Sequence, residues 1–327
     1  MVTRSKSSHN FNKFDFIVVG YGIAARCLLR EMAKDAKFQN KNILVLSKNS
    51  FFHSCSTHTT SVVCLSGIER GISPLGDLIV DSYDLAKEYY ESLDSSIVER
   101  AVQFQVKNDD QGRVSISENK AYIIHPERLL AQLEHEYMGN LNITFIDDVV
   151  AKIENGAVHT LNNECYNSDR IIVAAGAWSN FLQKDISCDD LNRSKFVSGS
   201  YLTFSNIDFG NEAFTYAYGH FNIVYRATTH ELLIGGTTVK ENIEAPSVSE
   251  LEEQYKTFEN LFKEIHHDKF VMPEFSKGKI TTGMRHKGRK RTPFFGQVSE
   301  GLYLMSGLYK NGFSFPFYGA KKITSLL

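Results

Sequence analysis

The chain has 327 residues, with 36 lysines and arginines against 38 aspartates and glutamates, so its formal net charge is −2. This balance excludes a protein whose whole surface is adapted to nucleic acid or to an anionic membrane, and nucleic acid is not expected as a partner. No apolar run approaches the roughly 20 residues that span a bilayer. The length exceeds the usual size of one compact core and therefore predicts two domains.

The cysteines and the first residues bear on the location of the protein. The chain has five cysteines, and none of them forms a CxxC pair. The stretch Met1–Asn12 is polar and basic and lacks the apolar core of a secretory signal. An odd number of cysteines without a signal predicts a reduced, cytoplasmic chain. No metal site is predicted.

The most informative segment has the order strand, glycine-rich turn, helix, strand. Phe16–Val19 is a continuous apolar run, typical of a strand buried on both faces, and a helical pattern follows the turn. In the turn, Gly20 permits the tight bend, Gly22 lets the backbone approach a pyrophosphate, and Ala25 allows close packing of the helix. Such turns also occur for packing alone, but this context is the one that the dinucleotide fingerprint requires. Ser47 replaces the usual acidic residue after the second strand and can still bond a ribose.

The rest of the chain alternates strands and helices and then becomes mostly β. The spacing of apolar residues predicts a helix at 25–36, and Pro126 marks the start of a helix at 127–133. Further helices are predicted at 82–93 and 248–266. Strands are predicted at 42–46, 102–106, 114–117, 143–146, 149–153, 170–179, 201–204, 221–226, 231–235 and 302–305. A hairpin turn is predicted at 109–112, and a glycine-rich loop and a short helix at the end of the chain.

Four separated segments carry a resemblance to one family. They are the turn Val18–Ala25, the run Ile172–Ser179 (IVAAGAWS), the run Leu232–Thr238 (LLIGGTT), and Gly283–Arg285 combined with Gly307–Gly312. In this order and spacing they are similar to the motifs of the FAD-dependent amine and amino-acid oxidases of the D-amino-acid oxidase type. The glycine oxidase and sarcosine oxidase branch is the most similar. The matches extend over nearly the whole chain.

The resemblance implies the fold and the cofactor. The fold class is α/β, with a Rossmann-like FAD-binding domain on a parallel sheet and a substrate domain on a mixed or antiparallel sheet. Residues 1–84, 121–188 and 281–327 are assigned to the FAD-binding domain, and residues 85–120 and 189–280 to the substrate domain. The implied cofactor is FAD.

The resemblance also implies the site residues. Arg285 takes the place of the arginine that pairs with a substrate carboxylate, and Lys310 lies in the loop that runs along the flavin ring. These two are the expected catalytic residues, although a surface cation in a basic loop remains the alternative for Arg285. His286 replaces the proline that usually follows this arginine. The residues expected to bind FAD are Gly20, Gly22, Ala25, Ser47, Ser56, Thr57, Thr60, Ala175, Gly176, Trp178, Gly307, Asn311, Gly312 and Phe313.

Two further expectations concern the surroundings of the flavin. Some relatives attach FAD covalently through Cys or His, and His53, Cys55 and His58 lie in the loop beneath the flavin, although ordinary loop residues are the favoured interpretation. One tyrosine of the substrate domain is expected to touch the substrate. The candidates are Tyr201, Tyr216, Tyr218 and Tyr225.

The activity implied by the resemblance is oxidation of the C–N bond of a small amine or amino acid. Hydride transfer to flavin N5 would give an imine, and O₂ or another acceptor would reoxidise the flavin. Three alternatives stay open. They are a 2-hydroxy-acid dehydrogenase, a flavoprotein acting on a larger anionic substrate such as a modified tRNA base, and a flavin-binding protein with a structural or regulatory role. The second alternative rests on residues 275–299, which contain no acid and seven lysines or arginines.

Overall fold

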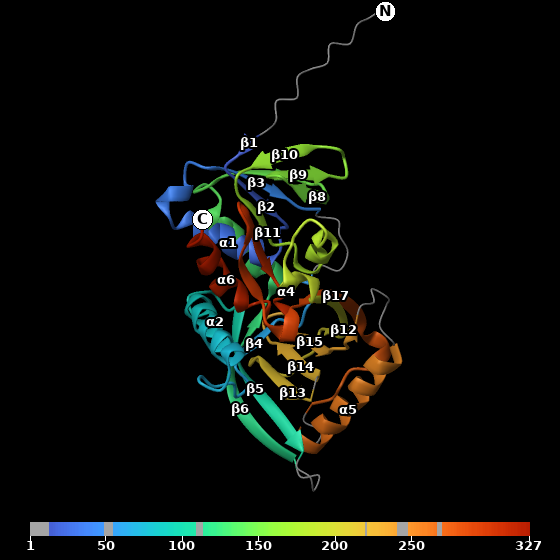
Figure 1. The fold of residues 1–327 in the computed structure, drawn as a ribbon. Coiled ribbons are helices and arrows are strands. Elements are labelled where there is room, and N and C mark those ends of the chain that lie inside the picture. Colours follow the sequence, from blue (N-terminus) through green and yellow to red (C-terminus); the bar gives the residue numbers. More distant parts are fainter. Residues whose placement is uncertain (1–12, 49–54, 109–113, 220, 241–247, 267–269) are drawn as a thin grey trace, which may run out of the picture.

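The computed structural model describes residues 13–48, 55–108, 114–219, 221–240, 248–266 and 270–327. Within these residues the strands form three sheets, of four, six and nine strands. Figure 1 shows the six-stranded sheet in the upper half of the molecule and the nine-stranded sheet in the lower half. The six- and nine-stranded sheets are those of the α/β architecture that the sequence predicts, and the four-stranded sheet is an addition to it.

The six-stranded sheet is parallel except for one edge strand, with the order β18-β19-β11-β2-β3-β7. Its strands are β2 (Phe16–Val19), β3 (Asn42–Leu46), β7 (Asn142–Ile146), β11 (Ile171–Val173), β18 (Phe294–Ser299) and β19 (Leu302–Ser306). The four residues of β2 are all buried, because core clusters cover both faces of the sheet. Burial on both faces explains why the central strands are continuous apolar runs rather than alternating ones.

Helices pack on this sheet and beside it. The helices are α1 (Ile23–Ala33), α2 (Pro74–Tyr90), α3 (Pro126–Tyr137) and α6 (Phe315–Thr324). The side chains of α1 that point to the sheet belong to one core cluster with β2 and β3. The predicted helices at 25–36 and 127–133 are thereby confirmed, with shifted ends.

The prediction of a helix at 82–93 was wrong at its start, because α2 begins at Pro74 and ends at Tyr90. Ser73 is the N-cap, and its hydroxyl accepts a hydrogen bond from the Gly76 N–H at 3.0 Å. Pro74 occupies the first helical position, where its missing N–H costs nothing. The prediction did not use this Ser-Pro start signal, which lies eight residues before the predicted start.

The nine-stranded sheet has the order β16-β12-β15-β14-β13-β5-β6-β4, and β17 pairs with β12. Its strands are β4 (Val62–Cys64), β5 (Val98–Asn108), β6 (Val114–Ile124), β12 (Lys195–Ser205), β13 (Phe214–Tyr218), β14 (Phe221–Arg226), β15 (Glu231–Gly235), β16 (Val239–Lys240) and β17 (Lys279–Lys287). The predicted strands are present, and β5, β6 and β12 are longer than predicted. The predicted turn at 109–112 lies outside the described residues. Strands β4 and β17 pair in this sheet although the predicted domain boundaries, which stay a prediction, assign most of their residues to the FAD-binding domain.

Helix α5 (Val248–His266) has the bounds that the sequence predicts, and it covers one face of the nine-stranded sheet (Figure 1). Leu251, Phe258 and Phe262 of this helix pack on the strands in one core cluster. The opposite face of the sheet carries Tyr201 and Leu233, which belong to a separate cluster. The face away from α5 is therefore the one that is free to form a site.

The remaining elements are short. The four-stranded sheet contains β1 (Lys13–Phe14), β8 (Val150–Glu154), β9 (Ala157–Thr160) and β10 (Cys165–Ser168), and α4 spans Asp189–Asn192.

The predicted strand at 170–179 was too long. Strand β11 ends at Val173, and a 3₁₀ helix spans Gly176–Leu182, because Gly176 turns the chain with a φ of 58°.

The layer between α5 and the sheet gives a prediction about stability. Phe258 is fully buried there, whereas Phe181 is 62% exposed. We expect Phe258→Ala to lower the free energy of unfolding by about 3–5 kcal/mol, and Phe181→Ala by less than about 1 kcal/mol. Urea unfolding of the two variants measures the difference. Equal losses would show that α5 is not a packed part of the fold.

Candidate active site

The turn after β2 lies directly against the end of β11. Gly20 has a φ of 101°, a conformation that favours glycine. A Cβ at Gly20 would lie 2.6 Å from the Ala174 carbonyl oxygen and 2.8 Å from the Ala175 Cα. Ala25 is fully buried in the core cluster that also contains β2 residues. The structure thus brings three of the predicted cofactor residues, Gly20, Ala25 and Ala175, to one place.

The N-terminus of α1 is suited to an anion. Its N-cap is Gly22, which supplies no side-chain cap, and its first turn contains no acidic residue. The Ser56 hydroxyl accepts a hydrogen bond from the Ile23 N–H at 3.0 Å, and a Cβ at Gly22 would lie 2.8 Å from this hydroxyl oxygen. A helix N-terminus with close backbone approach favours a phosphate. The residues present therefore fit the pyrophosphate of a dinucleotide, with Ser56 beside it.

Other predicted cofactor residues lie at the same edge of the parallel sheet. Ser47 follows β3, and its N–H donates to the Ile146 carbonyl at 3.2 Å. Gly176 follows β11, and a Cβ there would meet no atom within 4 Å. The Trp178 ring stacks on Phe181, with 5.3 Å between ring centres. Ligands of open α/β sheets bind beyond the carboxyl ends of the strands, which is where these residues lie.

The segment after β19 contains the last group of predicted cofactor residues. Gly307 has a φ of 79° and packs against the backbone of Gly288. Asn311 ends a 3₁₀ turn, and a Cβ at Gly312 would meet open space. The Phe313 side chain belongs to the hydrophobic core, and its carbonyl accepts a hydrogen bond from the Tyr90 hydroxyl. Phe313 therefore offers a ligand its backbone and not its ring.

Two glycines form a notch in the nine-stranded sheet. Gly199 of β12 and Gly283 of β17 are paired directly across the two strands. A Cβ at Gly199 would overlap Nη2 of Arg285, and a Cβ at Gly283 would overlap the His58 carbonyl oxygen. This pair, which we call the glycine notch, makes room for the Arg285 guanidinium and for the loop that carries His58.

Arg285 is oriented by backbone carbonyls and by an aromatic ring. Its Nη2 donates to the Thr237 carbonyl at 2.9 Å and, at 3.4 Å, to the Ser198 carbonyl. Its Cζ lies 5.6 Å from the centre of the Tyr309 ring. Among the described residues, no acceptor binds Nη1 or Nε of this half-buried side chain. An oriented guanidinium with free N–H groups is suited to a carboxylate.

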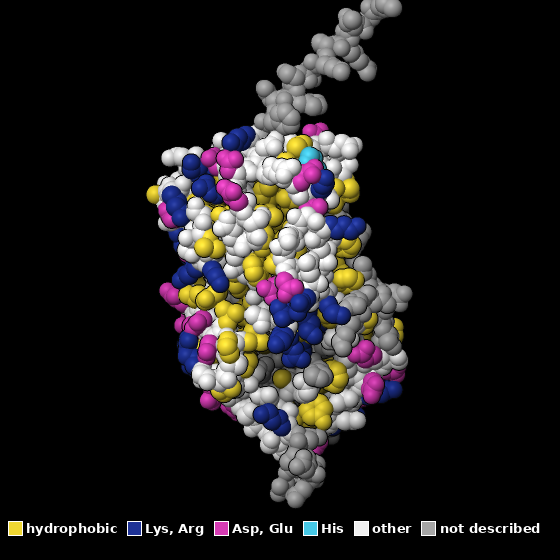
Figure 2. All heavy atoms as spheres, viewed as in Figure 1, with side chains coloured by type: hydrophobic (Ala, Val, Ile, Leu, Met, Phe, Trp, Pro, Cys, Tyr) yellow, Lys and Arg dark blue, Asp and Glu magenta, His cyan; other side chains and the backbone are white. Residues whose placement is uncertain are grey.

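Positive charges gather around this arginine. Burial and then the charges of Arg285 and Arg291 lower the pKa of the Lys310 ammonium. The Nζ of Lys287 lies 5.7 Å from the centre of the Tyr309 ring. Figure 2 shows a concentration of Lys and Arg side chains in the middle of one face of the molecule. The two predicted catalytic residues therefore lie close enough to interact, in a strongly positive environment.

His286 has a positioning contact that the sequence analysis missed. The imidazole is buried, and burial lowers its pKa to about 4, so the ring is neutral at pH 7. Its Nδ1 accepts a hydrogen bond from the Gly307 N–H at 3.3 Å, which leaves Nε2–H to donate to the Ser194 hydroxyl at 2.7 Å. The replaced proline was the only signal in the sequence. The ring connects β17 to the segment that follows β19.

The loop between β3 and β4 crosses the notch. Burial raises the pKa of the Cys55 thiol to about 11, against the opposing charge of Arg285, so the thiol stays protonated and is a weak nucleophile for covalent attachment. The buried Nδ1 of His58 has no hydrogen-bond partner among the described residues. His53 lies outside the described residues. Thr60 Oγ1 accepts a long hydrogen bond of 3.4 Å from Asn222 Nδ2.

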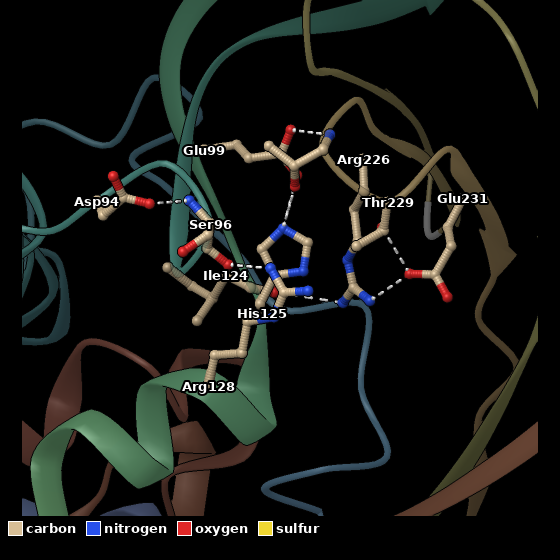
Figure 3. Close-up of polar contacts among 10 residues, drawn as sticks. Asp94, Ser96, Glu99, Ile124, His125, Arg128, Arg226, Thr229 and Glu231 are labelled. Carbon is tan, nitrogen blue, oxygen red and sulfur yellow. Dashed lines mark hydrogen bonds and ion pairs between the residues drawn. The ribbon is translucent and has the colours of Figure 1, made fainter. Parts of the chain in front are cut away.

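A cavity of about 650 Å³ opens on the same face of the sheet as Arg285. It is lined by Thr57, Tyr201, His125, Arg226, Glu231 and Thr281, among others. Figure 3 shows its paired charges: His125 Nε2 lies 2.7 Å from Glu99 Oε1, and Arg226 donates to Glu231 at 3.3 Å. Burial raises the pKa of the Glu99 carboxyl, but hydrogen bonds from His125 and the Thr228 N–H lower it on balance. No sequence motif indicated these pairs.

Only one of the four candidate tyrosines borders this cavity. Tyr201 lines it, next to Thr281 of β17. Tyr216 and Tyr225 are buried on the other face of the sheet in the core beneath α5, and Tyr218 packs against the same core. Tyr201 is therefore the one candidate tyrosine among the described residues that borders the cavity.

The sequence matches a known family over most of its length. The model of the DAO family, described as FAD dependent oxidoreductase, matches residues 105–326. The chain belongs to this family. Its cofactor is therefore FAD, and the α1 turn, the open glycine positions and the carboxyl edge of the parallel sheet fit this dinucleotide.

Solved structures show the same fold at low sequence identity. Glycine oxidase from Geobacillus kaustophilus has a TM-score of 0.73 and 16% identity, covering 96% of this chain and 94% of that one. L-proline dehydrogenase from P. horikoshii has a TM-score of 0.75 and 14% identity, covering 96% and 93%. The FAD-bound L-alpha-glycerophosphate oxidase from Mycoplasma pneumoniae has a TM-score of 0.69 and 13% identity, covering 97% and 95%.

One further comparison and one search of the helices complete the description of this FAD-dependent oxidoreductase. No curated protein sequence matches it significantly. Among the described residues, no helix has the length and apolar character that crossing a membrane requires.

The fit of Gly22 to the phosphate site gives a prediction about cofactor retention. In Gly22→Val, the added side chain would occupy the space between α1 and the Ser56 hydroxyl. We expect the purified variant to lose most of its FAD, measured as flavin absorbance per protein after gel filtration. Gly296→Ala is the control, since Gly296 does not have a positive φ and its Cβ would make only ordinary contact with the Phe294 ring, at 3.4 Å. Full FAD content in Gly22→Val would contradict the assignment of this turn.

The neutral state of His286 gives a prediction about pH. Its pKa is about 4 in the folded protein and about 6.5 unfolded, so the stability it contributes is present above pH 6.5 and is lost as the pH falls towards 4. The expected loss is up to roughly 3 kcal/mol. His286→Gln keeps an acceptor and a donor without titrating, and should lose less stability between pH 7.5 and pH 4.5 in urea unfolding. Equal losses in both proteins would refute the assignment.

Proposed function

We propose that this FAD-dependent oxidoreductase oxidises the C–N bond of a small amine or amino acid that carries a carboxylate. The observation that supports this proposal is the glycine notch, which holds the Arg285 guanidinium on the same sheet face as the cavity. Arg285 then binds the carboxylate through the N–H groups that the protein leaves free. Glycine oxidase and L-proline dehydrogenase, which share the fold, are named for substrates of this kind.

The residues that we propose to hold FAD are those at the carboxyl edge of the parallel sheet. Gly20, Gly22 and Ser56 would bind the pyrophosphate at the α1 N-terminus, and the segment Gly307–Phe313 would lie along the ring. When bound, FAD accepts the two electrons of the oxidised bond as a hydride. The backbone N–H groups and Lys310 in this segment supply positive potential beside it.

The charges around Arg285 also act on the substrate amine. An amine must have a free lone pair to form a double bond to carbon, so it must react as the neutral base. Burial and neighbouring positive charges both lower the pKa of an ammonium, as they do for Lys310. The same environment therefore favours the neutral, reactive amine without a dedicated catalytic base. A 2-hydroxy acid would be held by the same arginine, because Arg285 recognises the carboxylate alone.

The proposal is tested by anaerobic bleaching of the flavin. The holoenzyme is mixed with amino acids, N-methyl amino acids, 2-hydroxy acids and amines that lack a carboxylate. We expect loss of the oxidised-flavin absorbance with members of the first two groups. Bleaching by hydroxy acids alone would favour the hydroxy-acid dehydrogenase. FAD that no compound bleaches would favour a structural role.

The role of Arg285 gives a prediction about kinetics. We expect Arg285→Ala to raise KM for a carboxylate substrate by about 100-fold, because a charge-assisted, two-point contact is lost. Gly199→Ala should have the same direction of effect, since its Cβ displaces the guanidinium without removing the charge. Arg289→Gln is the matched control, because Arg289 pairs with Asp189 on the surface. Unchanged steady-state kinetics in Arg285→Ala would disprove the role.

A further inference from the structure

More positive charge surrounds Arg285 than one carboxylate requires. Lys287 lies two residues after Arg285 on β17. Arg291 ends the 3₁₀ turn after β17, and Lys310 lies in the 3₁₀ turn after β19. We call these three residues the cation arc. The Tyr309 ring contacts both Arg285, at 5.6 Å, and Lys287, at 5.7 Å. Figure 2 shows Lys and Arg side chains concentrated in the part of the face where β17 lies in Figure 1.

The charges of the arc are not neutralised within the described part of the protein. None of Lys287, Arg291 and Lys310 forms an ion pair with a described residue. The neighbouring carboxylate of Asp189 accepts from Arg289 at 3.1 Å and from Arg193 at 2.9 Å, and both partners lie outside the arc. Like charges held together without counter-ions repel each other, and an anion between them removes the repulsion.

The backbone holds the arc in place. Three residues of these two turns have positive φ values: 51° at Lys290, 67° at Arg291 and 47° at Tyr309. Residues other than glycine rarely adopt this left-handed backbone conformation. The two turns are tied together by the close approach of Gly307 to Gly288 and by a β-bridge between Lys287 and Leu308. Strained backbone held by surrounding contacts is typical of a binding site.

We propose that the substrate is a dianion, whose first carboxylate binds Arg285 and whose second anionic group, a carboxylate or a phosphate, binds the cation arc. This inference rests on the proposed function, since it concerns the same substrate. A single carboxylate is satisfied by one guanidinium, whereas the arc adds Lys287 at the same Tyr309 ring and Lys310 near enough to be influenced by the charges of Arg285 and Arg291. An acidic amino acid, an amine with two carboxylates and a phosphorylated amine or hydroxy compound all meet this description.

The test compares binding of mono- and dianions to the FAD-loaded enzyme by titration calorimetry. The probes are acetate, malonate, succinate and inorganic phosphate. We expect the better of the two dicarboxylates, or phosphate, to bind at least about tenfold more tightly than acetate. A preference for the dicarboxylates over phosphate identifies a carboxylate as the second group, and the reverse identifies a phosphate.

Variants assign the preference to the arc. Arg291→Asn removes one charge, and asparagine tolerates the left-handed backbone at this position. Lys287→Gln removes another charge from β17 and replaces the lysine with a side chain of similar length. Each should reduce the dianion preference by about fivefold and leave acetate affinity unchanged. Arg289→Gln, which removes a cation already paired with Asp189, is the matched control and should leave the preference intact.

Three results would overturn the proposal. Equal affinity for acetate and every dianion is the first, and an equal effect of Arg291→Asn and Arg289→Gln is the second. The third is that Arg291→Asn or Lys287→Gln weakens binding of a single-stranded oligonucleotide but leaves the affinity for malonate and phosphate unchanged. This result would make the arc a contact for nucleic acid. Failure of the proposed function is separate. In that case no amine bleaches the flavin, while the dianion preference and its dependence on the arc remain measurable.

Discussion

The candidate site depends on one steric constraint, the absence of two Cβ atoms at the glycine notch. Because Gly199 and Gly283 are directly paired, the hollow extends across two strands instead of one. The Arg285 guanidinium and the carbonyl of His58 occupy this hollow from two sides. A side chain at either glycine would push the arginine or the loop out of the sheet face. The notch therefore connects the fold of the nine-stranded sheet to the chemistry proposed for it.

The half of the site that we propose to bind FAD could be predicted from the sequence because its determinants are local. Phe16–Val19 and the glycines after it form a strand, turn and helix within one short segment, and the apolar run and the residue types suffice to recognise it. The predicted β2, α1 and β3 are all present. Their order in the sheet then places Ala175 beside Gly20, because β11 pairs with β2.

The substrate side could be predicted only in part, because its contacts join distant segments. The pairing of Gly199 with Gly283 depends on the register of β12 and β17, and β17 was not predicted as a strand. The sequence could not decide among the four candidate tyrosines for a related reason. A strand in a two-faced sheet alternates its side chains, so Tyr201 and Tyr216 look alike in sequence but lie on opposite faces. Strand register decides which of them meets the cavity.

The net charge of −2 hides an uneven distribution, and His286 shows how the protein limits it. A protonated imidazole beside Arg285 would add another positive charge where Lys310 already has a lowered pKa. Burial instead keeps the ring neutral, with a pKa of about 4, and lets Nδ1 accept the hydrogen bond from the Gly307 N–H. The replacement of proline by histidine thus adds a contact between β17 and the segment after β19 without adding charge. Of the cations that remain, Arg291 and Lys310 are exposed to solvent, so an anion can reach them.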